Sequence, residues 1–149
     1  IEDKQVSWLP SYGPEMRGGT ANCSVIISDE PVGSPIVSKP DILVAMNLPS
    51  LDKYEDTVVP GGTIFVDSTL IERKVNRTDV NVYYVPSTQL ASDNNLGNLA
   101  NMIMMGKLMD VNGDYNKEGI DAALGKVISA RHADMQAVNL KALEIGKNN

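Results

Sequence analysis

The chain has 149 residues, a length that suits one compact domain with a single core. Hydrophobic residues make up 42% and charged residues 21%, close to the globular average, which argues against a disordered, collagenous or coiled-coil protein. The net charge of −6 argues against nucleic acid or an anionic membrane as a partner, because either would require a concentrated Lys/Arg surface.

The sequence holds one cysteine and one histidine, Cys23 and His132. A disulfide, a Cys-rich zinc site or an iron–sulfur cluster each requires more of these side chains, so the chain alone predicts none of them. No apolar run reaches the roughly 18 residues of a membrane span. Residues 1–9 lack the charged and apolar regions of a signal peptide, and we expect a cytoplasmic protein.

The first half of the sequence predicts β-strands separated by turn residues. Residues 29–40 are too rich in proline and glycine for a regular element, and residues 49–55 predict a short helix. Pro10 is expected to end the first strand, and the last three runs are apolar enough for strands buried on both faces of a parallel sheet. The strand candidates are, in chain order, residues 5–9, 23–28, 41–46, 63–67 and 80–85.

From residue 87 onward the sequence becomes helical. The first helical segment is apolar on nearly every face and breaks at residues 112–114, so we expect a sheet, neighbouring helices or a partner chain to bury it all round. Residues 117–129 and 134–146 carry apolar residues at helical spacing, and Gly146 is expected to cap the last turn. The methionines clustered in the first segment are Met102, Met104, Met105 and Met109.

Strands that alternate with short helices predict crossover units and an α/β fold. We expect a three-layer, Rossmann-like domain: a mostly parallel sheet with helices on both faces, and a helical C-terminal third. The chain contains neither Gly-x-x-x-x-Gly-Lys-Ser/Thr nor Gly-x-Gly-x-x-Gly, so it holds no self-contained nucleotide-binding fingerprint.

Two further patterns favour a structural interpretation over a chemical one. Residues 110–114 imitate the start of a calcium-binding loop, but Tyr115 stands where the turn requires glycine and Asp121 where a bidentate glutamate is needed. A polar turn between helices is therefore favoured. Cys23 and His132 could form a nucleophile–base pair, but a small hydrophobic role for the cysteine and a surface position for the histidine are favoured.

The loop over residues 10–22 is the strongest candidate for a ligand site. It follows a predicted strand, and ligands of open α/β sheets bind at strand ends. Gly18 and Gly19 permit close backbone approach and an anion-binding nest of amides, and Arg17 adds a charged fork suited to phosphate or carboxylate. The alternative is a tight structural loop in which Arg17 pairs with Glu15 or a neighbouring chain.

This loop resembles the signature of the gamma subunit, or gamma domain, of the 2-oxoacid:ferredoxin oxidoreductases. Its Tyr-Gly-Pro-Glu-Met-Arg-Gly-Gly-Thr-Ala-Asn form is more similar to the 2-oxoglutarate and branched-chain members than to the pyruvate members. The similarity covers nearly the whole chain. The residues that carry it, in order and spacing, are 11–23, 26–31, 34–37, 40–47, 60–62, 96–106 and 139–143, with Gly146.

The resemblance implies a complex that oxidatively decarboxylates a 2-oxoacid to its acyl-coenzyme A and passes electrons to ferredoxin or another acceptor. In such complexes thiamine diphosphate, with Mg, lies between the alpha and beta subunits, and iron–sulfur clusters are carried by beta or a ferredoxin-like delta subunit. Gamma supplies assembly surface and part of the coenzyme A side, with no catalytic or metal-binding residue and no cofactor of its own. The implied binding residues are Ser11, Tyr12, Gly13, Glu15, Arg17, Gly18, Gly19 and Thr20.

Two other functions remain open at this point. The chain could be a purely structural assembly subunit, or a free-standing domain that binds an anionic metabolite. Members of the resembled family usually begin with a strand and a glycine-rich turn leading into a helix, about thirty residues before the position that matches residue 1. We therefore expect residues 1–149 to form a single gamma-type domain that lacks this strand–turn–helix unit, and that self-associates or is marginally stable in isolation.

Overall fold

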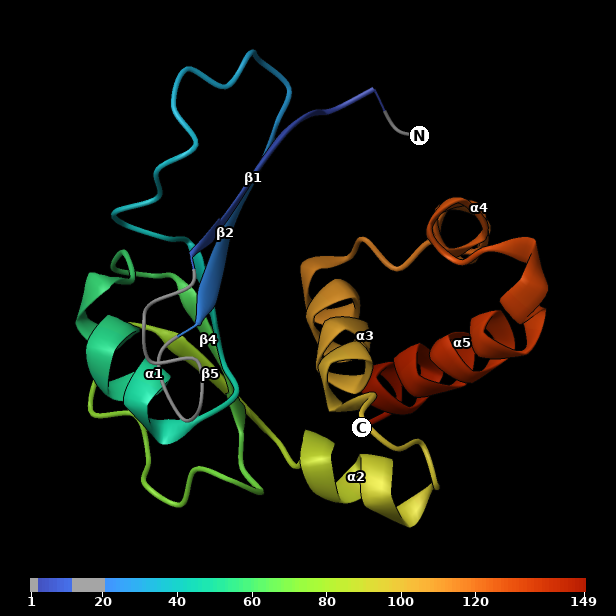
Figure 1. Ribbon diagram of the computed structural model, residues 1–149. Helices are drawn as coiled ribbons and strands as arrows, with labels where there is room; N and C mark the ends of the chain where they lie inside the picture. Colours follow the sequence, from blue (N-terminus) through green and yellow to red (C-terminus); the bar gives the residue numbers. More distant parts are fainter. Residues whose placement is uncertain (1–2, 12–20) are drawn as a thin grey trace.

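The computed structural model describes residues 3–11 and 21–149, and this part of the chain contains two separate sheets (Figure 1). The strands are β1 (Gln5–Ser11), β2 (Asn22–Ser28), β3 (Ile42–Ala45), β4 (Thr63–Asp67) and β5 (Asn81–Val85). The helices are α1 (Leu48–Tyr54), α2 (Ser87–Asp93), α3 (Ala100–Asn112), α4 (Lys117–Val127) and α5 (Ala133–Lys147), with short 3-10 helices η1 (Glu55–Thr57) and η2 (Ala130–His132). None of the helices described is long and apolar enough to cross a membrane.

β3, β4 and β5 form a parallel sheet with β4 in the middle, as the apolar runs predict. Successive side chains of β4 alternate between two buried clusters. Ile64 and Val66 pack with Leu51 of α1, whereas Phe65 packs in the cluster that contains Ile103 of α3. Helices therefore cover both faces of the sheet, with α1 on one side and α2, α3 and α5 on the other (Figure 1). The predicted three-layer α/β architecture with a helical C-terminal third is confirmed.

The two connections between the parallel strands differ in kind. α1 and η1 form a helical crossover from β3 to β4, and Asn47 caps α1 by accepting a hydrogen bond from a backbone N–H of the first turn. The connection from β4 to β5, residues 68–80, contains no helix, contrary to the expected alternation of strands and helices. Arg73 holds this segment against the crossover by donating hydrogen bonds to Asp52 and Glu55.

β1 and β2 form an antiparallel hairpin that is separate from the parallel sheet (Figure 1). At the end of the hairpin that leads into the loop, Ser11 lies opposite Asn22. The prediction that Pro10 ends the first strand is wrong, because Pro10 lies opposite Cys23 within the ladder. A proline is tolerated there because each strand of a two-stranded hairpin has one edge that makes no ladder hydrogen bonds.

α3 and α5 cross with their backbones in direct contact at two glycines. A Cβ atom added to Gly106 would lie 2.0 Å from the Leu143 carbonyl oxygen, and one added to Gly146 would lie 1.8 Å from the Ile103 carbonyl oxygen. Gly146 lies within α5, which ends with Asn148 as its C-cap. The prediction that Gly146 caps this helix is therefore wrong, since the glycine serves the close crossing instead.

α3 is buried on the side that faces the sheet and α5, but not all round. Ile103 and Met104 are buried, whereas Met105 is 47% exposed. The sheet and α5 therefore bury one side of α3, and burial of the side that carries Met105 by a partner chain stays a prediction. The predicted break over residues 112–114 is confirmed, because Gly113 ends α3 in the left-handed conformation, with φ at 78°.

Candidate functional site

The eight residues predicted to bind ligand lie in the sequence between Ser11 and Thr20. Ser11 is the exposed last residue of β1. The strand that leads into the loop belongs to the hairpin, so it does not end at the edge of the parallel sheet, where the ligand site was expected. The other seven residues lie outside the described part of the chain: Tyr12, Gly13, Glu15, Arg17, Gly18, Gly19 and Thr20.

A side-chain hydrogen bond joins the base of this loop to α1. Asn22, opposite Ser11 in the ladder, donates from Nδ2 to the hydroxyl oxygen of Tyr54 at 2.8 Å. Tyr54 is the last residue of α1, and its carbonyl oxygen accepts a hydrogen bond from Thr57 Oγ1 at 2.6 Å. The hairpin end that carries the loop therefore lies beside α1, as Figure 1 shows.

An ion-pair network fixes the corner formed by α1 and η1. Arg73 donates to Asp52 Oδ1 at 2.6 Å and to the buried carboxylate of Glu55 at 2.7 Å, and these hydrogen bonds raise the pKa of its guanidinium. Arg77 donates to Asp79 at 2.8 Å and to the carbonyl oxygen of Glu55 at 3.3 Å. The hydrogen bond from Arg77 lowers the pKa of Asp79. Arg73 and Arg77 thus connect α1 and η1, which lie beside the loop base, to the β4–β5 connection.

A buried carboxylate lies at the carboxyl edge of the parallel sheet, and the sequence analysis missed it. Asp67 ends β4 and is fully buried; it accepts hydrogen bonds from the Thr69 N–H at 3.1 Å and from Thr88 Oγ1 at 2.6 Å. Ser87 Oγ is also buried, and it has no hydrogen-bond partner among the described residues. Ligands of open α/β folds bind at this edge, but the hydrogen bonds of Asp67 go to Thr69 of the β4–β5 connection and to Thr88 of α2. In the sequence, the signal for this buried carboxylate is that Asp67 comes directly after the apolar residues of β4.

The other chemical candidates of the sequence lie on different elements. Cys23 is exposed on β2, so it does not take the packed role favoured for it, and His132 is exposed in η2 as expected. After α3 a polar turn forms, in which Asn112 donates to Asp114, in agreement with the favoured interpretation. Within residues 3–11 and 21–149, no group of three or more His, Cys, Asp and Glu side chains could hold a metal ion.

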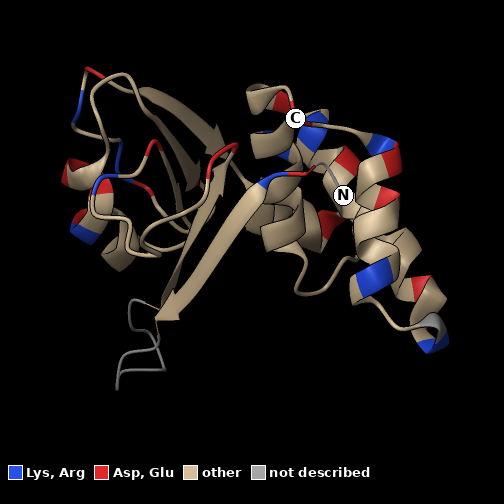
Figure 2. Ribbon diagram, turned by 90° about the horizontal axis from the view of Figure 1, so that it is seen from above, with Lys and Arg blue, Asp and Glu red and all other residues tan. Residues whose placement is uncertain are grey.

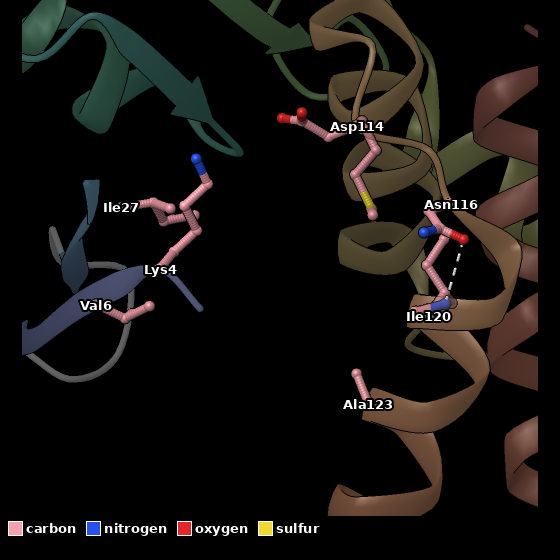
Figure 3. A pocket seen from close by; sticks show the side chains of 9 residues that line it. Lys4, Val6, Ile27, Asp114, Asn116, Ile120 and Ala123 are labelled. Atoms are coloured by element: carbon pink, nitrogen blue, oxygen red, sulfur yellow. Dashed lines mark hydrogen bonds between the residues drawn. The ribbon is translucent and has the colours of Figure 1, made fainter. Parts of the chain in front are cut away.

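One face of the hairpin is apolar and exposed. Val6, Trp8, Val25 and Ile27, which we call the apolar hairpin face, are between 52% and 68% exposed, and Figure 2 shows the two strands free of charged residues. A cleft of about 400 Å³ separates this face from α3 and α4 (Figure 3). Its walls are formed by Lys4, Val6 and Ile27 on one side and by Met109, Asp114, Asn116, Gly119, Ile120 and Ala123 on the other.

The family model described as pyruvate ferredoxin/flavodoxin oxidoreductase matches residues 1–148. Ketoisovalerate oxidoreductase subunit VorA of Methanothermobacter thermautotrophicus is 40% identical over 146 residues, which cover 97% of this chain and 30% of that protein. 2-oxoglutarate synthase subunit KorC of Methanocaldococcus jannaschii is 39% identical over 125 residues, which cover 83% of this chain and 67% of that protein. The chain therefore spans less than a third of VorA and two thirds of KorC.

The fold is also similar to that of a solved protein of the same kind. The keto/oxoacid ferredoxin oxidoreductase gamma subunit from Geobacter sulfurreducens superimposes with a TM-score of 0.73 at 30% sequence identity. The match covers 97% of this chain and 79% of that chain. Both the sequence and the arrangement of strands and helices thus extend the similarity across nearly all of the 149 residues.

Proposed function

Because the chain belongs to the pyruvate ferredoxin/flavodoxin oxidoreductase family, we propose that it acts as the gamma subunit of a cytoplasmic 2-oxoacid:ferredoxin oxidoreductase complex. The complex would oxidatively decarboxylate a 2-oxoacid to its acyl-coenzyme A and pass the electrons to ferredoxin or another acceptor. The observation that carries this proposal is the match to the Geobacter gamma subunit over 97% of the chain. The names of the VorA and KorC relatives favour a branched-chain 2-oxoacid or 2-oxoglutarate as the substrate.

Thiamine diphosphate, Mg and the iron–sulfur clusters would be held by alpha, beta and delta partner subunits. A single cysteine cannot ligate a cluster. Coenzyme A supplies the thiol that accepts the acyl group, and its phosphates suit the Arg17 guanidinium and the glycine amides beside it. We assign the coenzyme A side of the site to Ser11, Tyr12, Gly13, Glu15, Arg17, Gly18, Gly19 and Thr20. Support comes from the hairpin ladder, which brings Ser11 and Asn22 together at the loop base.

Substitution of Arg17 tests this site. In the complex reconstituted with its partner subunits, Arg17→Ala is expected to raise the KM for coenzyme A about tenfold, the effect of losing one charge-assisted contact to a phosphate. The complex should still assemble, as measured by size-exclusion chromatography. Arg131→Ala, an exposed arginine in η2, is the control and should leave the KM unchanged. Failure of Arg17→Ala to assemble, with an unchanged KM in any residual complex, would favour a purely structural subunit.

We also propose that a strand–turn–helix unit N-terminal to the hairpin completes the domain and covers the apolar hairpin face. A two-stranded hairpin is at best marginally stable in water without a further strand or helix against it. The cleft beside α3 and α4 has apolar side chains on both walls, among them Ile27 and Ile120. An apolar helix packed between these walls would remove both from water.

Trp8 and Cys23 are the sole tryptophan and cysteine of the sequence. The solvent exposure of these two side chains shows whether the apolar hairpin face is covered. In the 149-residue chain, Trp8 should emit like an indole in water and Cys23 should react rapidly with a thiol reagent, since both are exposed. In the full-length subunit, Trp8 emission should shift to the blue and Cys23 labelling should slow. Equal exposure of both side chains in the two proteins would contradict the proposal.

A further inference from the structure

The hydrogen bond between Asn22 and Tyr54 ties the base of the proposed coenzyme A loop to the rest of the domain. We propose that Tyr54 is a positioning residue: its hydroxyl, through Asn22, fixes where Ser11 lies relative to the parallel sheet. This inference rests on the proposed function, because it assigns to Tyr54 a role at that same site. Tyr54 is 32 residues from Asn22 in the sequence, so no local pattern connects them.

The described strands of the hairpin form no ladder with the parallel sheet. Their own ladder joins β1 to β2. The apolar hairpin face is exposed, and on the opposite face Ser24 and Ile26 are only half-buried. Because the two strands could tilt together without breaking the ladder, a side-chain hydrogen bond to α1 at the loop base helps to hold Ser11 in place.

Tyr54 belongs to a part of the fold that is well anchored. Leu51, one turn earlier in α1, is fully buried in the core. Arg73 bridges Asp52 and Glu55, on either side of Tyr54 in the sequence, and so fixes the end of α1 against the β4–β5 connection. The Thr57 hydroxyl also holds the Tyr54 carbonyl oxygen at 2.6 Å. The Tyr54 hydroxyl is therefore a fixed point to which a less supported hairpin can be attached.

Removal of this hydroxyl should disturb the site more than the fold. The hydrogen bond is neutral and half-buried, and such bonds contribute little net stability. Tyr54→Phe keeps the ring, its packing and the ammonium of Lys53 that lies 5.2 Å from the ring centre. The substitution therefore separates the orientation of the hairpin from the stability of α1.

The test uses the complex reconstituted with its partner subunits. Tyr54→Phe should raise the KM for coenzyme A about fivefold, the equivalent of one neutral hydrogen bond, while kcat and the melting temperature stay near their original values. Asn22→Ala should raise the KM by a similar factor, and the double variant should be no worse than either single one. Tyr115→Phe removes a hydroxyl from the loop between α3 and α4 and should leave the KM unchanged.

Combination with Arg17→Ala distinguishes this inference from the proposed function. If Tyr54 acts through the loop, Tyr54→Phe should add little to the KM of a complex that already carries Arg17→Ala. The inference is wrong, and the proposed function stands, if Arg17→Ala raises the KM but Tyr54→Phe does not, or if the two effects multiply. If Arg17→Ala leaves the KM unchanged, the proposed function is wrong, and the role of Tyr54 is wrong with it.

Discussion

Replacing Gly146 by alanine is expected to lower the free energy of unfolding by about 3 kcal/mol or more, because the new methyl group would enter occupied space. Its Cβ would lie 1.8 Å from the Ile103 carbonyl oxygen and 3.0 Å from the Lys107 nitrogen, which are backbone atoms that no side-chain rotation can move. α3 and α5 would have to separate, and the apolar contacts between them and the sheet would loosen. Gly106→Ala, whose Cβ would lie 2.0 Å from the Leu143 carbonyl oxygen, should have a similar effect.

Gly125 in α4 is a matched control for this prediction. A Cβ added there meets nothing within 4 Å, so Gly125→Ala should raise the free energy of unfolding by about 0.5–1 kcal/mol through better helix propensity. Urea denaturation of all three variants measures these differences. Similar shifts for Gly146→Ala and Gly125→Ala would show that the α3–α5 crossing can relax without cost.

Replacing Asp67 by alanine is expected to lower the free energy of unfolding by about 3 kcal/mol, because it removes a fully buried acceptor and leaves two partly buried donors without a partner. The Thr88 hydroxyl would lose its 2.6 Å hydrogen bond and the Thr69 N–H its 3.1 Å hydrogen bond, at a position that is fully buried. These bonds join the chain after β4 to the start of α2, so the variant would lose this connection at the carboxyl edge of the sheet.

Two further substitutions show whether this loss comes from the hydrogen bonds. Asp67→Asn keeps one acceptor oxygen and should recover part of the lost stability. Asp110→Ala removes a carboxylate from the exposed side of α3 and should change the free energy of unfolding by less than about 0.5 kcal/mol. The assignment fails if Asp67→Ala is no more destabilising than Asp110→Ala in the same urea titration.

The parallel core could be predicted because its signals are local. Residues 63–67 were predicted as a buried strand and form β4 over the same residues. Residues 112–114 were predicted to break a helix, and Gly113 does so. The family resemblance drawn from residues 11–23 is also confirmed by the match to residues 1–148, because a long ordered motif needs no tertiary information to be identified.

The contacts that were missed join residues that lie far apart in the sequence. Asp67 is 21 residues from Thr88, and Asn22 is 32 residues from Tyr54, so neither pair produces a periodic or local pattern. Gly146 was misassigned for the same reason. A glycine near a helix end ordinarily indicates a cap, and here the backbone of Ile103, on another helix, explains it.

The sequence by itself determined the α/β class, the family and the position of the Arg17 loop between two strands. Propensity, apolar periodicity and motif order act over short stretches of chain, which makes these features readable one segment at a time. The tertiary structure alone decided that β1 continues through Pro10 into a separate hairpin, that α3 and α5 meet at Gly106 and Gly146, and that Asn22 donates a hydrogen bond to Tyr54. Such features depend on how distant segments pack against one another, because close approach and burial of polar groups exist only once the chain has folded.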